Sequence, residues 1–431
     1  MNYAANPDPT TLLDNLKLLC TQSSVSGQTR ELTACADDVA SILRDVGLNC
    51  SIVKTPGAPI VIGTYDAGAE HTLLLYARYD VPPAGLRRSW TNDPFQPTVR
   101  NEALYARGAV AKAELVARAM ALRTLIARQV PLNITMVVEG ESVIGSPYLG
   151  LVHDQIGPVY ACLWSGGGFD ADGVPVVYTG VKGLLQVELR ASTAQALVPA
   201  SYAATVPNPI WTLTLALSSI KSEYEEILID GFYDDIVPPS RAALNMVQNV
   251  DVGEQARRDA WGIGQFVAHV KGPMLTRTET FSPSCNVSEF NVSGGSVPAI
   301  PQRASAELQF QLVPDLQPAR VFELLRAHLE ARGLDNLQVV QLPGAYPSAQ
   351  STELPFDAAS AAASVYSRPA AVLPLAPFAA PVALLVEQVA LVSCGLERPT
   401  SALVGPDEHV PLADVLAHTH LLIELITRIA V

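Results

Sequence analysis

The sequence predicts an α/β fold, a mixed sheet with flanking helices, into which a smaller α+β domain is inserted. Two apolar strands, at 73–81 and from residue 133, are joined by an Ala-rich helix that ends near Arg128, which is the pattern of a crossover connection. After residue 183 the alternating run LLQVELRAS begins a strand, helix, strands, helix, strand order that is typical of a small α+β sandwich. From Asp357 helices and a strand of the first arrangement return.

These changes of pattern set the expected domain boundaries. We expect residues 1–182 and 343–431 to form the α/β domain and residues 183–342 to form the inserted domain. Within the first domain, helices are expected at 9–20 and 29–46, where leucine and valine recur at helical spacing, and strands at 51–53, 60–64, 73–81 and 133–139.

The remaining elements follow the same periodicity. In the inserted domain, a helix is expected in VPNPIWTLTLALSSI, strands at 284–293, 304–314 and 337–342, and a second helix at 318–332. In the final part of the chain, helices are expected at 357–366, 381–388 and 411–429, with a strand in VALVSCG.

Composition excludes some classes of partner. The formal net charge is −14 and the pI is near 4.9, whereas nucleic acids and anionic membranes require clustered Lys and Arg, so we expect neither as a partner. The N-terminus lacks a basic start followed by an apolar run, and no later segment runs 18 residues without polar breaks, so we expect a cytoplasmic protein. The six cysteines form no Cys-x-x-Cys pair, which favours reduced, buried thiols.

Three polar motifs lie around the first crossover, where open α/β sheets place their sites. The first strand ends ARYDV, a turn reads ARGAVAKAE, and the second strand ends EGESVIGS. These motifs resemble, in order and spacing, those of the dinuclear-zinc metallopeptidases, the group of aminoacylases, carnosinases and desuccinylases. In that family they read Gly-His-x-Asp-Val, Gly-Arg-Gly-Ala-x-Asp-x-Lys-Gly and Glu-Gly-x-Glu-Glu-x-Gly-Ser. The resemblance implies a zinc-aminopeptidase-like domain with an inserted lid domain through which relatives dimerise.

The resemblance also shows which active residues are changed. Asp80 and, near the end, Pro406 and Glu408 are kept, whereas Ser142 stands for the general-base Glu. The five metal ligands of the family fall on positions without a ligand side chain, which are Arg78, Ala111, Val143, Ser165 and Val404. The family's substrate-binding His and Arg fall near Val198 and on Gln311, and its Gly-Gly-Ser loop falls on LAPFAAP at 375–381.

A zinc pair requires imidazole and carboxylate ligands, and Arg is a permanent cation that offers no lone pair. We therefore predict no catalytic residue in the family's sense, no metal and no cofactor. The first hypothesis is a pseudoenzyme that acts by binding a partner protein or ligand, as a homodimer through the lid domain.

Two alternatives remain open. One is a hydrolase of the peptidase or amidase type with a rebuilt, metal-free site in the same cleft, for which a Ser with Lys or Glu nearby supplies a nucleophile and a base; its candidates are Arg78, Asp80, Lys112, Glu114, Glu139, Glu141 and Ser142. The other is a structural protein that pairs with an active paralogue as a heterodimer.

Other acidic and histidine residues are expected to have ordinary roles. Asp230, Asp234 and Asp235 belong to a longer insertion at 225–249 without His or Cys, so we expect a solvated loop. His418 and His420 lie two residues apart on a predicted helix and point to different faces, which argues against a shared metal.

Overall fold

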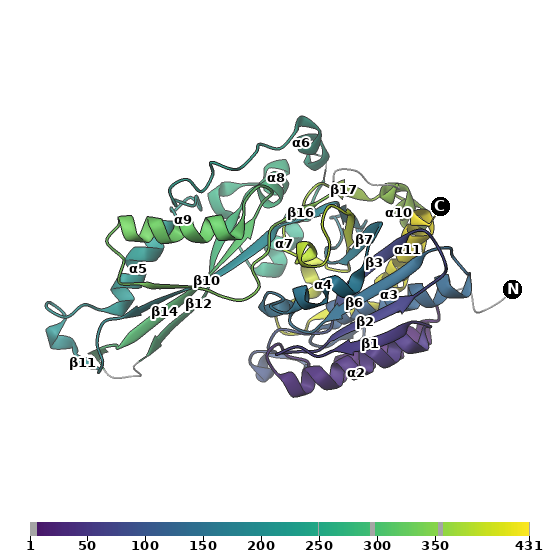
Figure 1. Cartoon of the computed structure of the whole chain (residues 1–431), viewed down its shortest axis with the longest axis horizontal. Coiled ribbons are helices and arrows are strands. Elements are labelled where there is room, and N and C mark those ends of the chain that lie inside the picture. Colours follow the sequence, from purple (N-terminus) through teal and green to yellow (C-terminus); the bar gives the residue numbers. More distant parts are fainter. Residues whose placement is uncertain (1–6, 249, 294–297, 352–356, 431) are drawn as a thin grey trace.

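A computed structural model describes residues 7–248, 250–293, 298–351 and 357–430. The remaining residues of each predicted domain and of the predicted 225–249 loop lie outside this description. Two sheets dominate the molecule, as Figure 1 shows, with the larger one on the right and the smaller one on the left.

The larger sheet has eight strands in the order β1-β2-β6-β3-β7-β18-β8-β17. Its strands are β1 (Asn49–Val53), β2 (Ile60–Tyr65), β3 (Thr72–Arg78), β6 (Asn133–Glu139), β7 (Ala161–Ser165), β8 (Val176–Tyr178), β17 (Ala371–Leu373) and β18 (Ala390–Cys394). The central strands β6, β3, β7 and β18 are parallel, whereas β1 and β2 are antiparallel to their neighbours, so the sheet is mixed.

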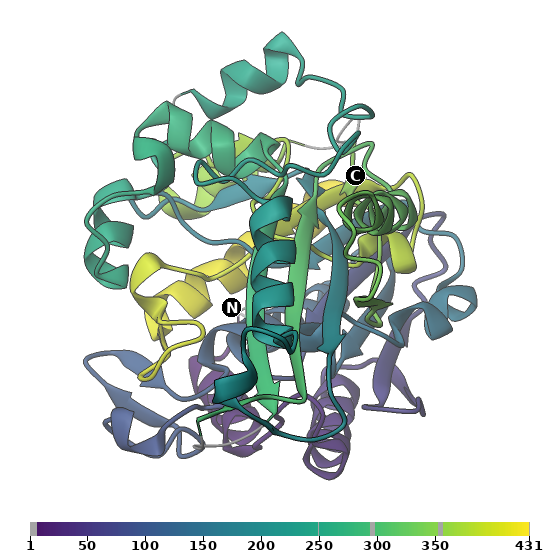
Figure 2. The ribbon, with the colours of Figure 1, turned by 90° about the vertical axis from the view of Figure 1, so that its left-hand side faces the viewer.

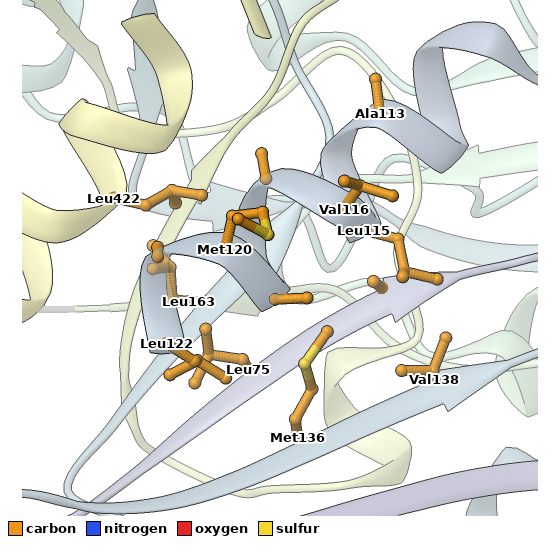
Figure 3. Packing of buried hydrophobic residues seen from close by; sticks show 14 of the residues in the cluster. Leu75, Ala113, Leu115, Val116, Met120, Leu122, Met136, Val138, Leu163 and Leu422 are labelled. Atoms are coloured by element: carbon orange, nitrogen blue, oxygen red, sulfur yellow. The ribbon is translucent and has the colours of Figure 1, made fainter. Parts of the chain in front are cut away.

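Alternate residues of the central strands face opposite sides of this sheet and enter two separate cores. Leu73 and Leu75 pack with the helices α1 (Pro9–Thr21), α2 (Thr29–Asp45), α3 (Ala109–Ala127), α10 (Ala358–Tyr366) and α11 (Leu412–Ile429). Figure 3 shows side chains of α3 against Leu75 and Met136 on the sheet and Leu422 on α11. Leu74 and Tyr76 point to the other face, toward α4 (His153–Ile156) and the turn that precedes it.

Because α3 lies between the sheet and its neighbouring helices, it is buried on nearly every side, and its small alanines allow that close packing. The helix therefore holds whatever side chains it carries in a fixed position next to the strand ends.

The smaller sheet is antiparallel, in the order β12-β14-β10-β15. Its strands are β10 (Gly183–Ser192), β12 (Ser284–Ser293), β14 (Arg303–Leu312) and β15 (Gln338–Gln341), and its helices are α5 (Pro209–Ile220) and α9 (Pro318–Ala331). Both helices pack on one face of this sheet, and Figure 2 shows α5 lying over its strands. This observed arrangement is the one expected for residues 183–342, whereas the domain boundaries themselves stay a prediction.

Three short helices lie in the segment between α5 and β12 and were not predicted. They are α6 (Arg241–Val247), α7 (Glu254–Trp261) and α8 (Pro273–Phe281). Asp234 and Asp235 are exposed, as expected, and Asp230 pairs with Arg332 at 3.4 Å.

Short strands form the remaining small sheets. The remaining strands are β4 (Thr98–Arg100), β5 (Ala103–Tyr105), β9 (Gly180–Val181), β11 (Val198–Pro199), β13 (Ala299–Ile300), β16 (Ala349–Gln350) and β19 (His409–Pro411). The helix predicted at 381–388 is wrong, because only a 3-10 turn forms at Val382–Leu384 and Gln388 has a left-handed backbone conformation, with a φ of 47°. Among the described residues, no helix is long and apolar enough to span a membrane.

Candidate active site

The carboxyl ends of four parallel strands meet at one edge of the larger sheet. Arg78 ends β3 in register with Glu139 at the end of β6, and Ser165 ends β7 in register with Cys394 at the end of β18. This is the edge at which open α/β sheets hold their ligands. The structure therefore brings together residues that are far apart in the sequence.

Asp80 follows β3 and is fully buried. Its Oδ2 accepts hydrogen bonds from the Ser26 hydroxyl at 2.7 Å and from the backbone N–H of Val143 at 2.8 Å, whereas its Oδ1 has no partner among the described residues. Arg78 is partly buried. Burial lowers the pKa of Arg78, and the negative charges of Asp80, Glu114 and Glu408 outweigh that effect and raise it.

Glu114 and Ser165 form the pair that is most suggestive of chemistry. Glu114 lies in the first turns of α3 and is buried, and Ser165 is half-buried at the end of β7. The Ser165 hydroxyl donates a hydrogen bond to Oε2 of Glu114, and the backbone N–H of Leu396 donates to Oε1 at 2.9 Å. Burial raises the pKa of Glu114, although the charges of Arg118 and Arg78 and both hydrogen bonds oppose the shift.

A second carboxyl group lies nearby in a less accessible place. Glu139 is buried and accepts hydrogen bonds from the Tyr76 phenol and, at 2.8 Å, from the Ser146 hydroxyl. Burial raises the pKa of Glu139 to about 8. Burial and the charge of Glu139 raise the pKa of the Tyr76 phenol, and a hydrogen bond with the Ser142 hydroxyl opposes part of this shift. Ser142 is thus placed next to a tyrosine.

The residues kept from the motifs hold the scaffold. Glu408 accepts hydrogen bonds from Arg107 at 2.9 Å and from the backbone N–H of Gly108 at 2.9 Å, at the start of α3. Gly108 has a φ of 84°, and a Cβ there would lie 2.3 Å from Val81, so only glycine fits this turn. These contacts explain why the framework survives independently of the metal ligands.

Lys112 and three histidines are not part of the Ser165–Glu114 pair. The Lys112 ammonium donates to the carbonyl oxygens of Leu19 and Gln22 at 2.8 and 3.0 Å, which ties α3 to the end of α1. His409 lies against Tyr105, with ring centroids 4.7 Å apart. His418 is buried, whereas His420 on the same helix is partly exposed, which agrees with the expectation of separate roles.

A cleft of about 1660 Å³ adjoins the strand ends and extends to α7, α8 and β12. Gly167, which closely follows Ser165, and Val404 line it, and Val404 is 81% exposed. Glu397 lies in the loop after β18, lines the cleft and is exposed to solvent. The surrounding protein raises the pKa of Glu397 to about 7, mainly by desolvation, with a smaller contribution from the charge of Glu114.

The residues at this edge do not fit a pair of zinc ions. Ala111, Val143 and Val404 offer no donor atom, the Ser165 hydroxyl is engaged with Glu114, and Arg78 brings a positive charge to the same place. Within the part of the chain that the structure describes, no group of three or more His, Cys, Asp or Glu side chains is placed to hold a metal ion.

Sequence reasoning missed two features of this edge. It named Ser165 and Glu114 separately, because they are 51 residues apart in the sequence and no motif joins them. It did not name Glu397, which lies outside the three motifs. The only signal for Glu397 was a carboxylate shortly after the apolar strand VALVSCG, at the strand end where sites are expected.

Several solved structures resemble this chain in fold. The crystal structure of an M20 family metallo-carboxypeptidase, Sso-CP2 from Sulfolobus solfataricus, matches with a TM-score of 0.88 and 27% identity, over 96% of this chain and 99% of that chain. Human carnosine dipeptidase 1 matches with a TM-score of 0.84 and 19% identity, over 98% of this chain and 96% of that chain. These likenesses confirm the predicted mixed α/β fold with flanking helices.

Curated relatives include dipeptidases. A Cys-Gly metallodipeptidase of Schizosaccharomyces pombe is 25% identical over 66% of this chain and 63% of its own length. A Beta-Ala-His dipeptidase of Mus musculus is 26% identical over 64% of this chain and 58% of its own length. The matched part thus spans about three fifths of these relatives.

These comparisons correct the first hypothesis on function. The prediction that the chain is a catalytically inactive pseudoenzyme is wrong, because the proteins that it resembles in sequence and structure are named as dipeptidases and a carboxypeptidase. They favour the alternative, a hydrolase of the peptidase or amidase type. The model of peptidase family M20/M25/M40 matches residues 74–428, and the chain belongs to this family.

Proposed function

We propose that this protein hydrolyses a peptide or amide bond in the cleft beside the strand ends, without a metal ion, by using Ser165 as the nucleophile and Glu114 as its base. The observation that carries the proposal is the hydrogen bond from the Ser165 hydroxyl to the buried Glu114 carboxylate. Membership of a peptidase family supports the choice of reaction.

The position of the pair suits a nucleophile. Ser165 is the last residue of β7 and is half-buried, and the backbone that follows it through Gly167 borders the cleft. Glu114 is held by the N–H of Leu396 on one oxygen and by Ser165 on the other. A base that is fixed by packing in this way loses no freedom when the reaction begins.

The electrostatics suit a base. A serine hydroxyl is a weak nucleophile unless an adjacent group takes its proton. Burial raises the pKa of Glu114 toward the range in which a carboxylate accepts a proton readily. The positive charge of Arg78 lies close enough to Glu114 to lower this pKa in turn, and the same charge favours an anion that develops nearby.

The reaction then proceeds in two balanced halves. The Ser165 Oγ attacks the carbonyl carbon, its proton passes to Glu114, and the carbonyl oxygen becomes an anion. As the C–N bond breaks, Glu114 returns the proton to the leaving amine, and an ester of Ser165 remains. Water loses a proton to Glu114 and attacks this ester. The bond between the carbonyl carbon and the Ser165 Oγ then breaks, and Glu114 passes the proton to this Oγ, which releases the acid and restores the Ser165 hydroxyl.

The test is hydrolysis of a panel of dipeptides and amino-acid amides by the purified chain, with and without a chelator. We expect turnover that the chelator leaves unchanged, a loss of at least about a thousandfold in kcat for Ser165→Ala, and about a hundredfold for Glu114→Gln. Ser142→Ala is the matched control, because Ser142 lies by Tyr76, and it should keep activity within about threefold. Activity that the chelator abolishes, or that survives Ser165→Ala, would contradict the proposal.

A further inference from the structure

The cationic side chains that line the cleft are already paired. The lysines and arginines in the lining are Lys182, Lys221, Arg257 and Arg398. The Arg257 guanidinium contacts both carboxylate oxygens of Glu279 at 2.8 Å, and that of Arg398 contacts Asp414 at 2.6 and 3.0 Å. Each positive charge is therefore neutralised within the protein or held by backbone groups.

The two lysines are also held by contacts within the protein. The Lys182 ammonium is nearly buried and donates to the carbonyl oxygens of Glu279 and Ser282 at 2.7 and 2.8 Å. The Lys221 ammonium donates to the carbonyl oxygen of Cys285 at 2.8 Å and forms an ion pair with Glu225. An anionic ligand would have to compete with these contacts.

Glu397 differs from all of these groups. Its backbone is fixed, because Gly168 forms a bridge with it and its carbonyl oxygen accepts from the N–H of Phe169 at 3.2 Å. Its carboxyl group, however, has no hydrogen bond or ion pair with any residue in the described ranges, and it is open to the water of the cleft. It directly follows Leu396, whose backbone N–H donates to Oε1 of Glu114 at 2.9 Å, so it lies beside the proposed catalytic pair.

Aromatic rings surround the same space. Tyr178 and Phe378 meet edge to face, with ring centroids 5.8 Å apart, and both line the cleft. Trp261, Phe266 and Phe281 line it from α7, α8 and the segment between them. The faces of such rings attract cations and hold apolar groups, whereas they offer nothing to a carboxylate.

We propose that the cleft binds a positively charged group of the substrate, an ammonium or guanidinium, through the Glu397 carboxylate and the surrounding aromatic rings. That this group belongs to a substrate rests on the proposed hydrolase function. The substrate class is then a peptide or amide that carries an amine or guanidine group. Glu397 is a specificity residue in this proposal, whereas the bond is cleaved by Ser165 and Glu114.

Binding tests the proposal separately from hydrolysis. The affinities of phenethylamine, a cation at pH 8, and N-acetylphenethylamine, its neutral counterpart, are measured by calorimetry at pH 8 with the full chain carrying Ser165→Ala. Because the proposed nucleophile is absent, binding is read whether or not the native chain is a hydrolase. We expect the cation to bind at least about tenfold more tightly, as one charged hydrogen bond would give.

Variants at Glu397 decide the assignment. Glu397→Gln should weaken the cation about tenfold and change the neutral ligand by less than about twofold. Glu226→Gln is the matched control, because Glu226 is another exposed carboxylate at the cleft, and the preference should survive it. Equal affinity for the two ligands, equal weakening of both by Glu397→Gln, or no binding of the cation at millimolar concentration would overturn the proposal.

Discussion

Glu139 is the buried acid whose ionisation has the clearest consequence for stability. Its pKa in the folded protein is about 8, because burial disfavours the charged form, against 4.5 for the ordinary group. Between pH 4.5 and 8, the folded state therefore holds a proton on Glu139 that the unfolded state has already released. The stabilisation by this proton is complete below pH 4.5 and is lost as the pH rises through 8.

Replacing Glu139 with Gln should remove this pH dependence. We expect Glu139→Gln to gain stability relative to the native chain by about 1.4 kcal/mol per pH unit over this window. Urea unfolding at pH 5, 7 and 9 measures the difference, with the exposed Glu387→Gln as control. A difference that stays constant across the three pH values would contradict the assignment.

His418 affects stability with the opposite pH dependence. It is buried on α11, neither ring nitrogen has a hydrogen-bond partner among the described residues, and burial lowers its pKa to about 3. The unfolded chain takes up a proton below pH 6.5 that the folded protein refuses, so stability is lost as the pH falls through this window. Relative to the native chain, His418→Leu should therefore gain about 2 kcal/mol of stability when the pH is lowered from 8 to 5. Thermal unfolding at pH 5 and 8 checks this, and a difference between the two chains that is the same at both pH values would disprove it.

At the residue scale, the sequence located the site better than it described its chemistry. The motifs placed Arg78, Asp80 and Ser142 at the strand ends, and the structure agrees. They could not show that Ser165 meets Glu114, or that Lys112 turns toward α1, because those contacts depend on how separate elements pack.

At the scale of elements, a buried ion pair joins the start of α3 to the loop before β19. Glu408 pairs with Arg107 while both are almost fully buried, and it accepts from the first N–H groups of α3. A carboxylate at a helix N-terminus is favoured by the helix dipole, and a buried Arg that loses its partner is costly.

Removing this charge should loosen the junction. We expect Glu408→Gln to cost about 3 kcal/mol, because Arg107 would remain buried without a counter-charge. The neighbouring Asp407→Asn, at a partly exposed carboxylate that accepts from Thr91, should cost about 1 kcal/mol. Urea unfolding of both variants compares them, and equal costs would show that the buried pair has no special weight.

Elements with a strong apolar period were predicted closely, and those without one were not. The strand at 284–293 and the helix at 318–332 agree with the structure to within a residue. The short helix α7 has no buried side chain among its residues, so it leaves no periodicity in the sequence. The apolar run at 381–388 shows the reverse error, in which burial without helical geometry was interpreted as a helix.

At the scale of the whole molecule, strand β12 is an edge of the smaller sheet, with no further strand beside it among the described residues, and it carries exposed apolar side chains, Val287, Phe290 and Val292. Such edges favour pairing with another chain. We propose that the protein forms a homodimer through this edge, and we expect Phe290→Lys to yield monomers in sedimentation velocity. Val99→Lys, at a residue of similar exposure on β4, is the control. A native chain that sediments as a monomer, or a Phe290→Lys dimer, would contradict this.

The most direct test of the proposed chemistry is covalent trapping of the serine. The native chain is incubated with a fluorophosphonate that carries an amino-acid side chain, and the adduct is located by intact-mass and peptide mass spectrometry. The proposed Ser165–Glu114 pair predicts stoichiometric labelling of Ser165 in the native chain and in Ser142→Ala, and far slower labelling in Glu114→Gln. No adduct, or an adduct on another residue, would contradict it.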